Sequence, residues 1–395
     1  FEEAIMTGNT LGWVIVAFVL YLLMMIAIGA FYAKGNNNSE DYFLGGRKLN
    51  GFVAALSAQA SDMSGWLLMG LPGAIYLTGV GGDGWIAIGL FIGTTLNWLF
   101  IATKLRRYTI RANNSVTLPT YFENRFHDEK KVLMTVSSIT IVVFFLVYCA
   151  SALSAGGQLF ESVFGIDYHV ALTIGALVVL VYTFLGGFTA VCVTDFIQGM
   201  LMLVGILAVP LFAYHFLTTG GTTLSAGLEA SGADSANFLN LMKNGDGSNN
   251  IISVISGIGW GLGYFGMPHI LVRFMAVRDE KEMTKSKATA ISWVALSLGF
   301  AVFIGILGRA YLPELVNGNN EKVFIEMIKK VFTVEVRAPF IAGLFLCGIL
   351  AAIMSTADSQ LLVSASTHTR RNKHDSSRTI FRSAKNTTPR RLNRQ

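Results

Sequence analysis

Charged residues are scarce in this sequence: Asp, Glu, Lys and Arg make up only 14% of its 395 residues. A soluble domain of this size carries about 25% charged residues, so the composition excludes an ordinary soluble protein. Cysteine is scarce too, and the three cysteines lie in apolar runs without CxxC spacing. That placement favours packing roles over disulfides or metal ligation.

Motifs of enzymes and of ATP-driven pumps are also missing. The sequence has no GxxxxGK[ST] phosphate-binding loop, so ATP-driven transport has no support. It contains no nucleophile–base set and no metal-ligand spacing. We therefore expect neither an enzyme nor a bound cofactor.

Apolar residues are abundant: they form 53% of the chain and gather in runs long enough to cross a bilayer. This predicts an all-α polytopic membrane protein. A short interfacial helix is expected at 120–126 and an amphipathic surface helix at 320–332. Nine spans are expected, at residues 11–33, 53–77, 85–103, 132–158, 168–186, 196–217, 251–274, 288–309 and 338–366.

The distribution of Lys and Arg predicts the orientation. Loops 34–50, 104–131 and 273–287 hold 15 of these residues, whereas loops 218–250 and 309–337 on the opposite side hold six. Since cytoplasmic loops carry the excess of positive charge, we expect a multi-pass protein of the cell membrane. Its N-terminus is expected outside and its C-terminal tail in the cytoplasm.

The second span is interrupted by polar residues, Ser61-Asp62-Met63-Ser64-Gly65. A buried charge near the bilayer centre costs roughly 2.5–3.5 kcal/mol on insertion scales. A bound cation is the simplest compensation. Ser and Gly also weaken the helix here, which releases backbone carbonyls to act as ligands.

The ninth span carries two adjacent hydroxyls, Ser355 and Thr356, in an otherwise apolar stretch. Hydroxyls and carbonyls are the oxygen ligands that a small hard cation such as Na⁺ prefers. The alternative is that both side chains only hydrogen-bond to the preceding helical turn. The broken second span favours the cation interpretation.

The seventh span contains Trp260 and Tyr264, which helical spacing places on one face. Three glycines and Pro268 follow or intervene and permit unwinding. This aromatic face suits a small, partly apolar substrate, or else consists of ordinary packing aromatics. Asp195, at the predicted start of the sixth span, is either functional or an N-cap.

At these residues the sequence resembles the sodium:solute symporter family, over about residues 10–366. The resemblance implies a LeuT-like inverted-repeat fold of two five-helix halves, which here begin at the second and seventh spans. The strings that carry it are DYFLGGRKLN, ALSAQASDMSGWLLMGLPGAIYLTG, LPTYFENRF, YCASALSAGGQLFES, YTFLGGFTAVCVTDFIQG, WGLGYFGMPHILVRFMA and AAIMSTADSQLLV.

The resemblance also implies residue roles. Asp62 is expected to act in sodium coupling, Asp195 to influence sodium on the cytoplasmic side, and Arg47 to belong to the inner gate. The implied sodium ligands are the carbonyls of Ala60, Met63 and Ala352 with the hydroxyls of Ser355 and Thr356. The implied substrate residues are Ser64, Gly65, Trp66, Tyr148, Trp260, Tyr264 and Pro268.

The function implied by the resemblance is import of L-proline together with Na⁺ by alternating access. The expected partners are thus L-proline, Na⁺ and the lipid bilayer, without nucleic acid, and the oligomeric state stays open. Alternatives are another small amino acid or a monocarboxylate as substrate, or a membrane-embedded sensor module. A passive channel is disfavoured, because two occluding broken helices suit alternating access.

The C-terminus departs from the family pattern. Residues 367–395 hold nine Lys or Arg and one acidic residue, so the chain before them has a net charge of −2. We expect a transmembrane domain at 1–366 and a disordered, non-family tail at 367–395. The tail is either a polybasic segment for anionic lipid or RNA or a chain end that follows a truncation. We favour truncation after nine spans, which makes a non-functional fragment a further alternative.

Overall fold

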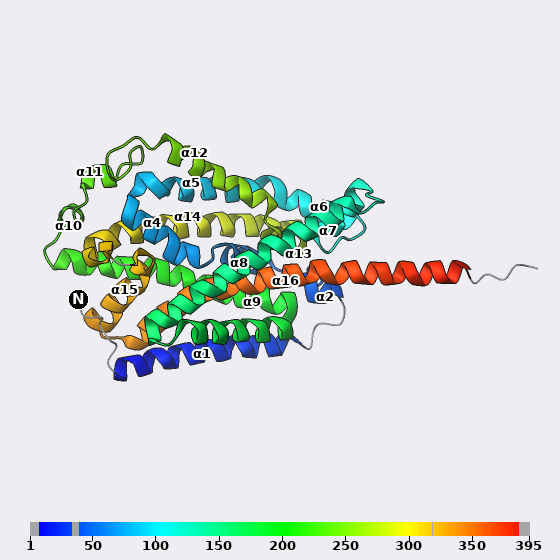
Figure 1. The fold of residues 1–395 in the computed structure, drawn as a ribbon, viewed down its shortest axis with the longest axis horizontal. Coiled ribbons are helices and arrows are strands. Elements are labelled where there is room, and N and C mark those ends of the chain that lie inside the picture. Colours follow the sequence, from blue (N-terminus) through cyan, green and yellow to red (C-terminus); the bar gives the residue numbers. More distant parts are fainter. Residues whose placement is uncertain (1–7, 34–38, 318, 387–395) are drawn as a thin grey trace, which may run out of the picture.

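The computed structural model of the protein describes residues 8–33, 39–317 and 319–386. These residues form helices joined by turns and two isolated bridges, and the long helices lie side by side along one direction (Figure 1). Within these described residues, six helical segments are long and apolar enough to cross a membrane. They are α1 (Gly8–Ala33), α5 to α6 (Val80–Arg111), α8 (Val132–Phe164), α9 (Tyr168–Thr219), α14 (Glu280–Tyr311) and the first part of α16, Pro339–Thr367.

Three further spans come from helices that break. In α9 the backbone breaks at Gly187, whose φ of 62° and ψ of −165° suit only glycine, and the chain turns back on itself (Figure 1). The second span consists of α3 (Gly51–Asp62), the wide turn η2 (Trp66–Gly70) and α4 (Leu71–Thr78). The seventh consists of α12 (Ile251–Trp260) and η4 (Gly261–Gly266), bent by 46° from α13 (Pro268–Ala276). Within the described ranges, helices therefore lie at the positions of all nine predicted spans.

Short helices connect the spans at both ends of the bundle. The predicted interfacial helix is α7 (Leu118–Phe126), which begins with a reciprocal capping box between Thr117 and Thr120. The predicted amphipathic segment forms η6 (Asn320–Lys322), α15 (Val323–Lys329) and η7 (Lys330–Glu335), with the apolar side of α15 buried. The others are α2 (Ser39–Leu44), η1 (Gly45–Arg47), α10 (Leu224–Ala230), α11 (Ser235–Phe238) and η5 (Pro313–Asn317).

Glycines bring α5 and α12 unusually close together. A Cβ added at Gly89 would lie 2.1 Å from the Gly257 carbonyl oxygen, and one added at Gly93 would lie 2.2 Å from that of Gly261. Helix α5 and the span formed by α12 and η4 thus both carry glycines four residues apart at the contact, a pattern that lets helix backbones touch in membranes. Beyond Gly93 the long helix contains a second wide turn, η3 (Asn97–Ile101), before α6 (Ala102–Arg111).

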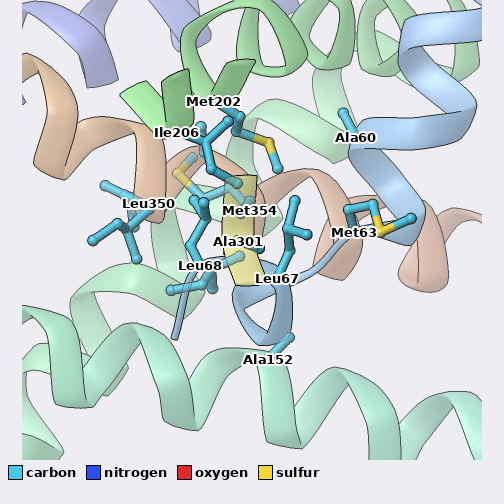
Figure 2. Packing of buried hydrophobic residues seen from close by; sticks show 14 of the residues in the cluster. Ala60, Met63, Leu67, Leu68, Ala152, Met202, Ile206, Ala301, Leu350 and Met354 are labelled. Atoms are coloured by element: carbon cyan, nitrogen blue, oxygen red, sulfur yellow. The ribbon is translucent and has the colours of Figure 1, made fainter. Parts of the chain in front are cut away.

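The broken second span lies in the middle of the buried core. Figure 2 shows Leu67 and Leu68 of η2 beside Met202 and Ile206 of α9 and Met354 of α16. All of these side chains are at most 2% exposed. The break is therefore surrounded by protein on the side away from α8.

Helix α16 (Pro339–Asn386) extends past the other helices (Figure 1). Its side chains beyond Thr367, and residues 387–395 altogether, lie outside the described residues. The division predicted at residue 366 stays a prediction.

Candidate cation and substrate sites

Helix α3 ends within the polar interruption. Its first turn is capped by Asn50, and the helix stops after Asp62, where Met63 adopts φ −81° and ψ 69°. The Ser64 amide then donates to the Asp62 carbonyl at 2.9 Å, so it does not serve the Ala60 carbonyl as a continuing helix would require. The break releases carbonyl oxygens inside the bundle, as the sequence predicted.

The two hydroxyls of the ninth span meet these released carbonyls. Ser355 Oγ donates to the Ala60 carbonyl at 2.8 Å, and Thr356 Oγ1 donates to the Ser61 carbonyl at 3.0 Å. Both hydroxyls also lie within 3.3 Å of the Ala352 carbonyl in their own helix. Both side chains are fully buried. The cross-helix contact and the back-bonding alternative therefore occur together.

The structure thus gathers the predicted cation ligands. Ser355 lies within hydrogen-bond reach of the Ala60 and Ala352 carbonyls and Thr356 within reach of the Ala352 carbonyl, while Met63 is buried at the break. Within the described ranges, no group of three or more His, Cys, Asp or Glu side chains could hold a metal ion. Neutral oxygens at this position suit an alkali cation better than a transition metal.

A cavity of about 600 Å³ opens directly beside the break. Six of the seven predicted substrate residues border it: Ser64, Gly65, Trp66, Tyr148, Trp260 and Tyr264. Pro268, the first residue of α13, does not border the cavity. The preceding residue, Met267, does. The substrate roles themselves stay predictions.

Aromatic rings form much of the cavity wall. The Trp66 and Trp260 rings stack with centroids 5.8 Å apart and an interplanar angle of 23°. The backbone of η4 is held by Asn97, whose Nδ2 donates to the Tyr264 carbonyl at 2.8 Å. The wall therefore offers flat apolar surfaces with hydroxyls at their edges.

Asp62 is the buried charge of this cavity. Its side chain is 7% exposed and borders the cavity, and its Oδ2 has no hydrogen-bond partner among the described residues. The Tyr264 hydroxyl interacts electrostatically with this carboxylate. A buried carboxylate with a free oxygen and released carbonyls nearby is suited to attract a cation.

The sequence analysis missed part of the cavity wall. Ser151, Ser154 and Gln158 of α8 border the cavity with Tyr148. Their spacing of three, six and ten residues from Tyr148 follows one side of a helix, so this pattern could have been used. Glu321 of η6 also borders the cavity, and nothing in its local sequence indicated this.

The prediction that Asp195 opens a span was wrong. Asp195 lies inside α9, fully buried, with its Oδ2 2.9 Å from Nη2 of Arg273. Ser57 Oγ also donates to this carboxylate, at 2.6 Å. Arg273 had been counted among the loop residues, yet it lies fully buried in α13. The backbone break is at Gly187, so Asp195 lies within the helix that follows, where Arg273 pairs with its buried charge.

A second carboxylate belongs to this buried cluster and was also missed. Asp358 of α16 accepts from the Tyr182 hydroxyl at 2.6 Å, and Ser359 Oγ donates to its other oxygen at 3.1 Å. Arg273 Nη2 donates to Ser359 Oγ at 2.5 Å. The cluster joins α3, α9, α13 and α16. Its sequence signal was a third carboxylate within an apolar span.

Arg47 joins three segments at the end of the bundle opposite η6. Its guanidinium donates to the carbonyls of Met275 at 2.7 Å and Ser115 at 2.8 Å, and to Asn114 Oδ1 at 3.0 Å. Burial lowers the pKa of Arg47 to about 10, so it stays charged at neutral pH. Leu49 and Val277 form a parallel bridge beside it. These contacts close this end of the molecule, and the gating role of Arg47 stays a prediction.

Broken spans around a central cavity define a multi-pass secondary transporter. The family model of the sodium:solute symporter family matches residues 42–391. The chain belongs to this family.

Three curated relatives are sodium/proline symporters. That of Salmonella typhimurium is 45% identical over 358 residues, covering 89% of this chain and 68% of the relative. That of Escherichia coli is 44% identical with the same coverage, and that of Haemophilus influenzae is 45% identical over 363 residues, covering 90% and 70%.

A solved structure shares the fold. It is described as a substrate-bound outward-open state of a Na⁺-coupled sialic acid symporter with a novel Na⁺ site. The TM-score is 0.74 at 21% identity, over 90% of this chain and 73% of that one. The predicted LeuT-like fold is confirmed.

Proposed function

We propose that this chain imports L-proline with Na⁺ by alternating access. The observation that carries the proposal is the buried Asp62 at a helix break, whose Oδ2 has no hydrogen-bond partner among the described residues and which borders a cavity of about 600 Å³. Relatives at 44–45% identity bear the name sodium/proline symporter, which supports proline and sodium as the pair transported.

In this proposal Na⁺ binds between α3 and α16. The carbonyls of Ala60, Met63 and Ala352 and the hydroxyls of Ser355 and Thr356 serve as ligands. The hydroxyls, which donate to α3 carbonyls, direct their lone pairs to the ion instead. Asp62 supplies the nearby negative charge, and the membrane potential contributes about 2.3 kcal/mol per charge per 100 mV.

Proline binds in the cavity beside this ion. The stacked Trp66 and Trp260 offer a flat surface for the pyrrolidine ring, while Ser64 and Tyr148 offer hydroxyls for its carboxylate. The sodium ligands and the proline cavity both lie at the break that ends α3. Binding of Na⁺ or of proline therefore stabilises the backbone conformation that the other solute needs.

The Lys/Arg-rich loops are cytoplasmic in this proposal, and the membrane is the cell membrane with the N-terminus outside. The contacts of Arg47 then close the cytoplasmic end, while η6 stands at the outer side of the cavity. Sodium favours this outward-open arrangement. Binding of both solutes favours closure of the outer side and opening of the cytoplasmic end.

Transport by reconstituted protein tests the proposal. An inward Na⁺ gradient is expected to drive saturable accumulation of labelled L-proline in liposomes, and an equal K⁺ gradient is not. Sodium-independent, non-saturating flux indicates a channel. Accumulation of another small amino acid or a monocarboxylate without proline contradicts the substrate assignment.

A further inference from the structure

The charged residues of the cavity wall are of one sign. Asp62 and Glu321 border the cavity, whereas no Lys, Arg or His among the described residues does. A sodium ion beside Asp62 compensates one of these charges. The charge of Glu321 then remains for the substrate to meet.

The position of Glu321 is fixed by packing. Residues 320–321 lie on α4, because a Cβ added at Gly73 would come within 2.9 Å of the Asn320 carbonyl oxygen and 3.0 Å of Glu321 Cα. The backbone of Glu321 thus lies against the second half of the broken span. Glu321 therefore borders the cavity from backbone that is packed against α4 and not from a free loop.

The charge of Glu321 is not compensated by the protein. No hydrogen bond or ion pair joins its carboxylate to any described residue, and the residue is exposed. Lys322, the next residue of η6, forms no ion pair with Glu321, and two further lysines have other partners. Lys329 binds Glu326 at 2.9 Å and the Ser162 carbonyl at 2.8 Å, and Lys330 donates to the Tyr311 carbonyl at 3.0 Å.

We propose that Glu321 selects substrates that carry an ammonium group and rejects monocarboxylates of the same shape. This rests on the proposed function and defines its substrate class as zwitterionic amino acids. An amino acid brings its own positive charge to Glu321. A monocarboxylate adds a negative charge to a wall that is already negative, within the Debye length of about 8 Å at physiological salt.

A pair of isosteric ligands tests the inference directly. L-proline and tetrahydrofuran-2-carboxylate differ in that an ether oxygen replaces the ring ammonium. Each compound is used to displace labelled proline from the protein in liposomes with Na⁺. The measured quantity is the inhibition constant of tetrahydrofuran-2-carboxylate divided by that of L-proline. We expect Glu321→Gln to reduce this ratio about three- to tenfold, since an exposed charge acts through screened solvent.

Matched variants identify the cause. Glu321→Asp keeps the charge and is expected to retain most of the discrimination. Glu335→Gln removes an equal charge from η7, outside the cavity wall, and is expected to leave the ratio unchanged. Raising ionic strength is expected to shrink the difference between wild type and Glu321→Gln.

An unchanged ratio in Glu321→Gln, with sodium-dependent proline binding intact, overturns this inference and leaves the proposed function standing. An equal shift in Glu335→Gln also overturns it, since general surface charge then accounts for the effect. If the wild-type protein shows no sodium-dependent proline binding, the proposed function fails and this inference fails with it.

Discussion

Asp62 places a carboxylate where the bilayer centre is expected, and its Oδ2 has no partner among the described residues. Asp62→Asn keeps the shape and removes the charge. We expect sodium-stimulated proline uptake to fall at least tenfold, because Glu321 is the only other carboxylate that borders the cavity among the described residues. Uptake at varied Na⁺ measures this, with Asp246→Asn in the loop between α11 and α12 as control. Wild-type sodium affinity in Asp62→Asn contradicts the assignment.

The hydroxyl of Thr356 is predicted to be a direct ligand. Thr356→Ala removes one oxygen, and we expect the sodium concentration for half-maximal uptake to rise about tenfold, equivalent to about 1.4 kcal/mol. Thr356→Ser is expected to restore it. Ser366→Ala, in the same helix, removes a hydroxyl that donates only to the Val363 carbonyl and is expected to change nothing. Equal effects of the two alanine variants indicate a role in helix stability alone.

The ion pair of Arg273 and Asp195 makes a stability prediction. Arg273→Gln leaves Asp195 and Asp358 buried without the cation, which is expected to destabilise the fold by about 3–5 kcal/mol. Thermal unfolding in detergent measures the loss. Adding Asp195→Asn to Arg273→Gln is expected to recover part of the lost stability. If the double variant instead loses further stability additively, Arg273 and Asp195 are not energetically coupled.

Sequence reasoning found some of these residues and not others for a physical reason. Asp62 and Thr356 stand out because a polar group inside an apolar run is costly wherever the run lies. Arg273 borders a charged loop, and a sequence does not indicate whether such a charge has a buried partner. Its partner Asp195 is 78 residues away.

At the scale of helices, glycines hold α5 and α12 in close contact, and both helices contribute residues to the cavity wall. Gly257→Ala places a Cβ 2.6 Å from the Trp85 carbonyl carbon, and such overpacking costs about 1–3 kcal/mol. Gly259, two residues on, has nothing within 4 Å. We expect Gly257→Ala to lower the unfolding temperature and Gly259→Ala to leave or raise it, since Ala favours helix. Equal changes contradict the contact.

Helix breaks were predictable where polar residues interrupt an apolar run, as at 61–65. The connection predicted at 187–195 was too long, because one glycine with positive φ suffices to turn α9 and the apolar residues after it are helical. Periodicity identifies helices well, but a turn of one residue leaves almost no signal.

At the scale of the whole molecule, the orientation is a testable prediction. Because Cys149, Cys192 and Cys347 are buried, an impermeant maleimide is expected to react with introduced cysteines only. Thr222→Cys in the segment after α9 should be labelled from outside intact cells, and Lys130→Cys before α8 only after lysis. The reverse pattern refutes the charge-based orientation.

The packing partners of the spans lay beyond sequence reasoning alone. The apolar pattern predicts that nine helices exist, and the family resemblance implies how they pair. Neither indicated that η6 brings Glu321 to the cavity, since this depends on the contact of Asn320 with Gly73 across almost 250 residues of chain.

The wide turn η3 and the tight turn η4 occur in two adjacent spans and contact each other through Asn97 and the Tyr264 carbonyl. Regular helix hydrogen bonding changes at both turns, and such turns often occur at functional positions. In mechanical terms, the two spans share one joint, at which the Asn97 amide links η3 to η4. Since α6 and α13 pack against each other, we expect a rotation about that joint to tilt both helices together and to open the end held by Arg47 as a unit.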